Sequence, residues 1–487
     1  MSPYSASGIL GTGQVVAVAD TGLDMQSCFF KDNGGNVSPS LYTDPKTQSG
    51  KRKVVQYCHT QQSDTTDVSR GHGTHVAGTV AGKIANANLY TDGQFDGVAP
   101  NAKIAFMDLG NANGRLTSLA ADKLYLPGRA AGARIHTNSW GGYYSGAPFY
   151  AGESVDDFLY NHPDQLVFFA AGNGGDFMPD PSLSQQSSAK NIIVVGSGET
   201  TLHSKDVDNV AYYSSKGPAH DGRFKPDIVA PGDALLSASA SGSSQSTCET
   251  AEKSGTSMAS PAAAGAAALM RQYFMDSKYW ERVCNPTYGS CGAFTPSGVL
   301  LKALILHSGE AMDMWNGDRE KRALGSPPDS VQGYGRLTMV NVLPFPNSPF
   351  ELYVADINRG ELNQNKVKVN YFWLTDSGEP LKVTLVWFDP PNVNGLTSKA
   401  LLHDLDLRVL SPKKEVHFGN RMEDTKNSNE QVHVPNPAVG VWQIKVKSKA
   451  LPVSGSQKYA LVITGGGYVG PNPSTVGFDV QAPDHGW

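Results

Sequence analysis

The stretch GTSMASPAAAGAAALM, residues 255–270, consists almost entirely of small side chains. A helix built from alanine and glycine must lie very close to its neighbours, because protein interiors are packed without large voids. No other segment of the sequence constrains the fold as strongly as this one. One serine, Ser257, lies where the helix is expected to begin. So close a packing holds the hydroxyl group rigidly, which makes Ser257 a candidate functional residue.

Short apolar segments alternate with helical patterns up to about residue 345. Several of the apolar segments are hydrophobic at successive positions, which is typical of strands buried on both faces. Helices are expected at 116–128 and at 153–163, where Pro163 ends the second. The alternation predicts an α/β fold, a doubly wound and mostly parallel sheet with helices on both faces. The predicted strands are QVVAVAD (14–20), AKIAFMDL (102–109), ARIHTNSW (133–140), QLVFFAAGN (165–173) and NIIVVGS (191–197).

The pattern changes after residue 350, where apolar and polar residues alternate and turn residues recur about every ten positions. This pattern predicts an antiparallel β-sandwich of about 110 residues. We expect a first domain over 1–345, a sandwich over 350–465 and a loosely held Gly/Pro-rich tail over 466–487. The sandwich strands are ELYVADI (351–357), KVKVNYFWL (366–374), LKVTLVWF (381–388), LDLRVLS (405–411), VWQIKVKS (441–448) and YALVITG (459–465).

Composition excludes several classes of protein. The chain has 487 residues and a formal net charge of −5, which is too mild to indicate a nucleic-acid partner or an anionic membrane surface. No apolar run approaches the roughly 18 residues that span a bilayer. Residues 2–14 lack the basic start and the apolar stretch of a signal peptide. We therefore expect either a cytosolic protein or a mature form whose leader has been removed.

The five cysteines are too few for a disulfide scaffold, and their number is odd. Cys284 and Cys291 flank the short stretch CNPTYGSC, in which a proline and a glycine allow a turn. This pair is a candidate disulfide, and at least one other cysteine is left over. The alternative, that all five are buried thiols, stays open.

Polar residues that suit nucleophilic catalysis stand at strand ends and helix starts. In a parallel sheet, sites form beyond the carboxyl ends of the strands. Asp20 and Asn173 each end a predicted strand, and His72 opens the small-residue segment GHGTHVAG. A serine hydroxyl needs a base to become nucleophilic, the base needs an acid to orient it, and the oxyanion needs fixed donors. With Ser257, these residues supply every part, because the Ser257 N–H and the Asn173 amide are both suitable donors.

The stretches VAVADTGLD, GHGTHVAG, AAGN and GTSMASP resemble the four signature stretches of the subtilisin-like serine proteases, or subtilases, over roughly residues 8–340. The C-terminal sandwich, ARIHTNSW and HDLDL further resemble the alkaline two-domain bacterial subtilases with a jelly-roll domain. The resemblance implies a serine endopeptidase that acts through an acyl-enzyme. It implies that Asp20 orients the imidazole of His72 and that His72 serves as general base and general acid. It also implies that Ser257 attacks the substrate carbonyl and that Asn173 holds the oxyanion.

The same resemblance implies a substrate site and a processed enzyme. No charged residue lies in the implied pocket-lining segments, which favours neutral P1 side chains. The expected pocket floor (174–190) contains Asp176 and Asp180. Either carboxylate would change this preference if it reached into the pocket. Polypeptides are the expected substrates, and we expect a secreted, extracellular monomer whose inhibitory pro-segment belongs to the precursor. The residues expected to line the S1 pocket and pair with the substrate backbone are Ser139, Trp140, Gly141, Gly142, Ala170, Ala171 and Gly172.

Other interpretations of these motifs stay open. His72 and His75 are three residues apart in HGTH, as a zinc pair would be, but no third ligand lies in a recognisable pattern. A catalytically inert subtilase fold that serves as a scaffold or binding protein is the alternative to an enzyme. The C-terminal domain either braces the catalytic domain or serves in substrate docking or adhesion.

A structural calcium ion is expected in the C-terminal domain, and no organic cofactor. Asp389 ends a strand, and Asp404 and Asp406 are two residues apart, so their carboxylates project from one face of a strand. Such carboxylates repel each other unless a cation intervenes, and calcium prefers oxygen ligands. The resemblance implies calcium ligands in this stretch, although His403 stands where relatives often carry Asn. The alternative is a solvated acidic edge or pairing with Arg408.

Overall fold

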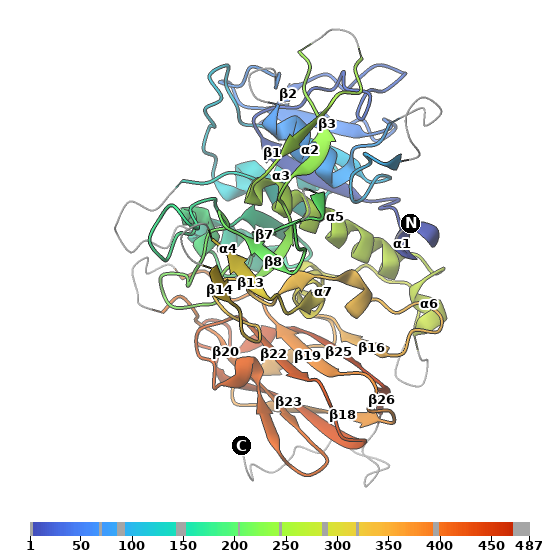
Figure 1. Ribbon diagram of the computed structural model, residues 1–487, viewed down its shortest axis with the longest axis vertical. Coiled ribbons are helices and arrows are strands. Elements are labelled where there is room, and N and C mark those ends of the chain that lie inside the picture. Colours follow the sequence, from blue (N-terminus) through green and yellow to red (C-terminus); the bar gives the residue numbers. More distant parts are fainter. Residues whose placement is uncertain are drawn as a thin grey trace. The chain divides into compact units, whose positions relative to one another are not determined.

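The computed structural model divides the chain into two compact units (Figure 1). Unit 1 comprises Met1–Tyr273 and Gly309–Leu337, and unit 2 comprises Phe274–Ser308 and Thr338–Trp487. The structure describes residues 3–67, 71–84, 93–142, 152–202, 205–242, 246–284, 291–317, 321–392 and 399–470.

Unit 1 is built on a large sheet whose central strands run parallel, which confirms the predicted α/β fold. β1 (Val15–Asp20) pairs in parallel with β4 (Lys103–Asp108) on one side and with β5 (Ile135–Asn138) on the other. The order of the strands therefore reverses at β1, which is where ligand sites of such sheets form. The other strands of this sheet are β2 (Ser40–Leu41), β3 (Val54–His59), β6 (Leu166–Ala170), β7 (Ile193–Gly198), β8 (Asn209–Ala211), β9 (Ile228–Pro231), β12 (Gly309–Glu310), β13 (Met314–Asn316), β14 (Lys321–Ala323) and β15 (Arg336–Leu337).

The main path of the sheet runs β12-β15-β9-β7-β6-β5-β1-β4-β3-β2, with β8, β13 and β14 attached beside it. β1, β4, β5, β6 and β7 are the five strands predicted from continuous apolar runs, and nearly all their residues are buried. β3 and β9 also run parallel in this sheet but were not predicted, because VVQYCH includes polar residues and IVAP is short. β10 (Leu235–Ala238) and β11 (Thr250–Lys253) form a separate antiparallel hairpin.

The small-residue segment forms α5 (Thr256–Met275) and packs as closely as its composition requires. A Cβ atom added at Gly265 would lie 2.7 Å from the Cβ of Val98, so no larger residue fits there. Both predicted helices exist, as α3 (Ala121–Ala130) and α4 (Glu153–Asn161), although α3 starts later than expected. The other helices of unit 1 are α1 (Pro3–Ala6) and α2 (His72–Ala81).

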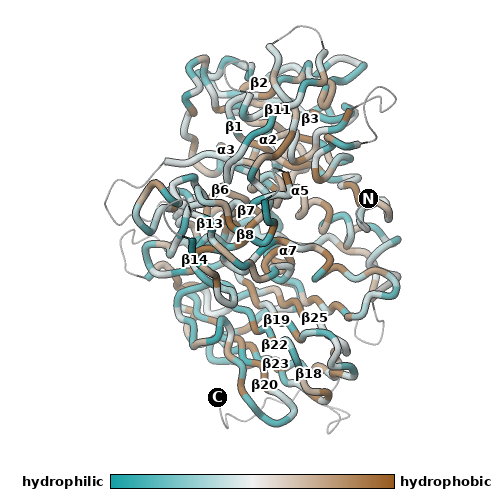
Figure 2. Tube along the Cα trace, in the orientation of Figure 1, coloured by the Kyte–Doolittle hydropathy of each residue, from teal (hydrophilic) through white to brown (hydrophobic). Residues whose placement is uncertain are grey.

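Unit 2 contains the predicted antiparallel sandwich. One sheet has the order β16-β25-β19-β22 and the other β21-β20-β23-β18-β26. Side chains from both sheets form one core, whose apolar residues can be followed in Figure 2. The strands are β16 (Glu351–Ala355), β17 (Glu361–Asn363), β18 (Val367–Leu374), β19 (Leu381–Val386), β20 (Asp404–Leu410), β21 (Val416–Phe418), β22 (Asn429–Val434), β23 (Gly440–Ala450), β24 (Ser456–Lys458), β25 (Ala460–Gly465) and β26 (Gly467–Gly470).

The division between the units differs from the boundary expected at 345–350, because α7 (Gly298–His307) belongs to unit 2. This helix is buried throughout and packs on β19 and β25. The imidazole of His307 lies between two threonine hydroxyls, 2.9 Å from Thr384 Oγ1 and 2.9 Å from Thr464 Oγ1. The expected tail begins with β26, which pairs with β18, and its remainder, 471–487, lies outside the described residues.

Two disulfides are present. Cys284–Cys291 is the predicted one. Cys28–Cys248 joins residues 220 positions apart, a separation at which sequence spacing gives no signal, and Cys58 is a buried thiol. No helix in the described ranges is both long enough and apolar enough to cross a membrane.

Buried histidines should make unit 1 sensitive to acid. Burial lowers the pKa of His136 to about 3, below the value of about 6.5 in an unfolded chain. Between these values the unfolded chain binds a proton that the folded chain does not, so stability falls as the pH drops below 6.5. From pH 7 to pH 5 the loss from this residue should be about 2 kcal/mol.

We expect His136→Phe to lose about 2 kcal/mol less stability than the wild type between pH 7 and pH 5, measured by urea unfolding. Phenylalanine keeps the edge-on ring contact with Tyr125, whose centroid lies 4.7 Å away. His220→Asn, at an exposed position, is the control. Equal losses in His136→Phe and the wild type would show that His136 titrates normally.

Candidate functional site

The carboxyl end of β1 places Asp20 at the reversal of strand order. Its side chain is 1% exposed. One carboxylate oxygen, Oδ1, accepts a hydrogen bond from the Thr21 N–H at 2.8 Å and lies 2.6 Å from Nδ1 of His72. Because a carboxylate only accepts, Nδ1 of His72 carries the proton in this contact and Nε2 is left as the basic nitrogen.

His72 is the first residue of α2, and its side chain is 27% exposed. The preceding residue, Gly71, has a left-handed backbone with φ +59°, which glycine adopts without strain. Burial lowers the pKa of the imidazole, but the charge and hydrogen bond of Asp20 outweigh it, so the pKa of His72 lies above its ordinary value. His72 is therefore a base whose protonated form is stabilised by a neighbouring acid.

Ser257 is the second residue of α5, as its place in the sequence predicts. Its hydroxyl donates to the carbonyl oxygen of Ser139 at 3.2 Å, and the Ser139 hydroxyl donates to the Ser257 carbonyl at 2.8 Å. These reciprocal bonds fix the start of α5 against the segment that follows β5. Between Ser257 and His72 the structure records no hydrogen bond in its described part.

The Asn173 side chain is oriented by Thr256. Its carbonyl oxygen Oδ1 accepts from the Thr256 N–H and from the Thr256 hydroxyl, both at 2.9 Å. With Oδ1 held in this way, the Nδ2 amino group is the end of the side chain that faces Gly255, where a Cβ would lie 3.3 Å from it. Asn173 therefore presents a donor close to the residues that precede Ser257.

His75 does not form a zinc pair with His72. Its Nε2 lies 3.1 Å from the Leu235 carbonyl and 3.0 Å from the Ala251 carbonyl, so it carries a proton and holds the β10–β11 hairpin. Burial lowers the pKa of His75 to about 4, although these carbonyls oppose the change. His75 is thus neutral at pH 7 and turned toward backbone carbonyls.

The segments expected to bind substrate lie at the carboxyl ends of β5 and β6. Trp140 donates from Nε1 to the Ala19 carbonyl at 3.0 Å and packs edge-on against Phe169 at 5.3 Å. Ala171 differs from the expectation of pairing with substrate, because its N–H bonds the Val195 carbonyl and its carbonyl accepts from the Ser184 N–H. The backbone of Ala171 is therefore already paired within the fold.

Glycine is needed at positions 141 and 172 because the backbone at each lies close to a neighbouring serine. A Cβ at Gly141 would lie 2.8 Å from the Cβ of Ser184, and a Cβ at Gly172 would lie 2.9 Å from the Ser215 hydroxyl. Gly172 also has φ +111°. Gly142 is anchored nearby, because its N–H donates to Gln186 Oε1 at 3.2 Å.

The acidic residues of the expected pocket floor have different surroundings. Asp180 Oδ1 lies 3.1 Å from the ammonium of Lys216, which itself stands 3.6 Å over the ring of Trp315. This ion pair balances the charge of Asp180, so it does not supply a free carboxylate for a basic P1 side chain. Asp176 is half-buried.

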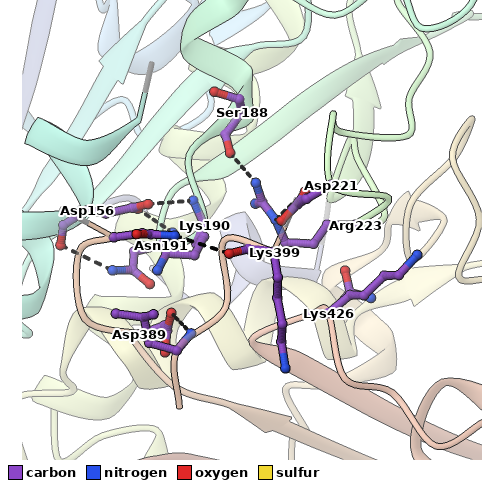
Figure 3. A network of polar contacts seen from close by, with 12 residues as sticks. Asp156, Ser188, Lys190, Asn191, Asp221, Arg223, Asp389, Lys399 and Lys426 are labelled. Carbon is purple, nitrogen blue, oxygen red and sulfur yellow. Dashed lines mark hydrogen bonds and ion pairs between the residues drawn. The ribbon is translucent and has the colours of Figure 1, made fainter. Parts of the chain in front are cut away.

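Residues at the end of this floor and directly after it are fixed by polar contacts (Figure 3). Asp156 on α4 accepts the Lys190 N–H at 3.0 Å and the Asn191 N–H at 2.8 Å. Arg223 binds Asp221 through Nε and donates to the Ser188 carbonyl at 2.6 Å. These contacts, one set from Asp156 and the other from Arg223, fix the segment that leads into β7.

Two further buried acids lie near Asp20 and were missed in the sequence. Asp108 ends β4 beside Asp20 in the register, and the motif FMD after an apolar run is the sequence signal for it. Burial raises the pKa of Asp108 to about 8, and the Tyr57 hydroxyl donates to its carboxyl group at 2.9 Å. Asp67, in the loop before α2, has no such strand signal.

The residues predicted to bind calcium are not assembled into a complete site. Asp389 accepts the Leu402 N–H at 3.0 Å and the His403 N–H at 2.7 Å. Asp406 lies 2.9 Å from the Lys449 ammonium. Asp404 is buried, but in the described ranges no group of three or more His, Cys, Asp or Glu side chains is placed to hold a metal ion. Arg408 pairs with Glu423, at 2.7 Å.

Comparisons with known proteins find a matching family model and several similar proteins. The family model described as "Subtilase family" matches residues 11–335. The "Serine protease/ABC transporter B family protein tagD" of Dictyostelium discoideum is 30% identical, over 87% of this chain and 29% of that protein. "Serine protease AprX" of Bacillus subtilis (strain 168) is 29% identical, over 54% of this chain and 58% of that protein.

The chain therefore spans about 30% of the length of the Dictyostelium relatives, two more of which match over 30% and 31% of their length. Among solved structures, the crystal structure of a serine protease of Aeromonas sobria is 16% identical with a TM-score of 0.43, covering 94% of this chain and 89% of that chain.

Proposed function

Because the chain belongs to the subtilase family, we propose that it is a serine endopeptidase in which Asp20, His72, Ser257 and Asn173 perform the chemistry. The observation that carries this proposal is the 2.6 Å contact between Asp20 and Nδ1 of His72 at the carboxyl end of the parallel strands. The contact sets the tautomer in which Nε2 is free to accept a proton. Polypeptides are the substrates that this family membership supports.

In the proposed reaction, Ser257 Oγ turns from the Ser139 carbonyl to Nε2 of His72 and gives up its proton as it attacks the scissile carbonyl carbon. The oxyanion is held by the Asn173 amino group and the Ser257 N–H at the start of α5. His72 then passes the proton to the leaving amine, which leaves an acyl group on Ser257. Water, deprotonated by His72, hydrolyses the acyl-enzyme and restores the serine.

The substrate preference, secretion, oligomeric state and processing of the enzyme are further proposals. The ion pair between Asp180 and Lys216 supports neutral P1 side chains. We further propose a secreted, monomeric enzyme that is produced from a precursor with an inhibitory pro-segment. An inert scaffold with the same fold is the alternative that the next experiment excludes or establishes.

Ser257→Ala should lower kcat by several orders of magnitude and leave KM nearly unchanged, because the lost group acts in the transition state. Hydrolysis of a neutral peptide substrate measures both constants. Ser260→Ala is the matched control, because it makes the same change on the same helix at a hydroxyl that contacts only Thr137, at 2.9 Å, among its recorded hydrogen bonds. If Ser257→Ala kept a tenth of the wild-type kcat, the proposal would be wrong.

The acid limb of the pH profile of kcat/KM should have its midpoint above the ordinary histidine value of about 6.5. Asp20 raises the pKa of His72, and the base must be neutral to accept a proton, so activity is lost as the pH falls through that raised pKa. Initial rates from pH 5 to pH 9 test this. A maximum below about pH 5 would indicate carboxylate chemistry instead.

A calcium ion in the sandwich also stays a proposal. Asp404 supports it, because its Oδ1 is buried without a hydrogen bond in the described part of the chain, whereas the Lys449 ammonium beside Asp406 opposes it. If calcium binds only the folded state, a hundredfold excess over Kd should stabilise by about 2.7 kcal/mol.

We therefore expect millimolar calcium to raise the melting temperature relative to EDTA, and Asp404→Asn to remove most of that rise. Asp376→Asn, at an exposed position, serves as the control. A full calcium effect in Asp404→Asn would place any bound ion elsewhere, and no effect in the wild type would exclude the ion.

A further inference from the structure

Asp67 is a buried acid outside the proposed catalytic group, with its side chain directed at the start of α2. The residue is 3% exposed. Its Oδ1 accepts from the Thr21 hydroxyl at 2.7 Å, and its Oδ2 accepts from the Thr74 N–H at 2.7 Å. Its backbone carbonyl accepts from the Gly71 N–H at 2.9 Å. Both oxygens of the carboxylate are therefore occupied by donors from two different elements.

These contacts replace a side-chain cap on α2. Helices begin with N–H groups that have no partner within the helix, and a capping side chain usually accepts from them. Gly71 occupies the capping position and has no side chain to do so. Instead, Thr74 N–H donates to Asp67, and Gly73 N–H donates to the Thr21 hydroxyl at 3.0 Å.

One continuous chain of hydrogen bonds thus joins the two proposed catalytic elements. It runs from Gly73 N–H to Thr21 Oγ1 and from Thr21 O–H to Asp67. Thr21 directly follows Asp20 in the sequence, and Gly73 directly follows His72. Any change in this chain moves the residue next to the acid relative to the residue next to the base.

We propose that Asp67 is a positioning residue for His72, which acts through Thr21 and the first turn of α2 to hold the imidazole against Asp20. The inference rests on the proposed function, since it assigns a role within the same site. Asp67 has no contact with substrate in this account. Its work is to fix the geometry in which His72 accepts a proton.

The charge of Asp67 acts on the same base. The ionisable groups around it are the carboxylates of Asp20 and Asp108, the Tyr57 hydroxyl and the imidazole of His72, with Lys253 also acting on His72. Burial raises the pKa of Asp67 to about 6, although its hydrogen bonds from Thr74 and Thr21 oppose this. Ionised Asp67 adds to the effect of Asp20 in raising the pKa of His72.

Three substitutions test the proposal. Thr21→Val removes the bridging hydroxyl, whereas Thr21→Ser keeps it. Asp67→Asn keeps the shape of the side chain but removes its charge and leaves one acceptor oxygen where Asp67 has two. Asp64→Asn is the matched control, because Asp64 lies in the same loop and its carboxylate bonds only Thr66 among its recorded hydrogen bonds.

We expect Thr21→Val to lower kcat about 10- to 100-fold with KM within twofold of wild type, because small displacements of a catalytic group are enough for such losses. Thr21→Ser should restore kcat to within about threefold, and Asp67→Asn should move the acid limb of kcat/KM about half a unit lower. Asp64→Asn should match the wild type.

The inference is overturned if Thr21→Val and Asp67→Asn both keep the wild-type kcat and pH profile in an enzyme that Ser257→Ala inactivates. It is also overturned if Thr21→Val loses kcat but Thr21→Ser loses as much, because the hydroxyl would then not be the active group. Retained activity in Ser257→Ala would instead contradict the proposed function itself, so the two failures are distinguishable.

Discussion

The contact between Asp20 and His72 depends on how closely α2 approaches the end of β1. A Cβ atom at Gly73 would lie 2.2 Å from the Gly22 carbonyl oxygen and 3.0 Å from the Cβ of Asp20. Any larger residue would push the helix away and lengthen the 2.6 Å contact that orients the imidazole. Because Asp20 is buried, water screens its charge little, and its effect on His72 is correspondingly strong.

The same use of small residues fixes the start of α5, which carries Ser257. A Cβ at Gly232 would lie 2.8 Å from the Gly255 carbonyl oxygen and 2.9 Å from the Cβ of Ala259. The strand ends and α5 therefore meet almost backbone to backbone, which leaves the serine little freedom to shift. The proposed acid, base and nucleophile come from three elements far apart in sequence, so their relative position depends on these close contacts rather than on any local segment.

The sequence predicts much of the fold and of the candidate site. The features that it does not predict depend on contacts between residues far apart in the chain. Continuous apolar runs predicted the parallel strands, and the residues at their ends marked Asp20 and Asn173. Asp67 escaped because its role depends on contacts to Thr21 and α2, which have no local pattern. The calcium ligands were inferred from spacing and from the family resemblance, neither of which indicates that the ammonium of Lys449, from another strand, lies against Asp406.

Labelling with an active-site-directed fluorophosphonate tests the central claim most directly, because the reagent modifies only a serine that a neighbouring base activates. Mass spectrometry of the labelled protein should find the adduct on Ser257 in the wild type, and His72→Ala should abolish it. An adduct on another serine, or equal labelling of Ser257 without His72, would contradict the account.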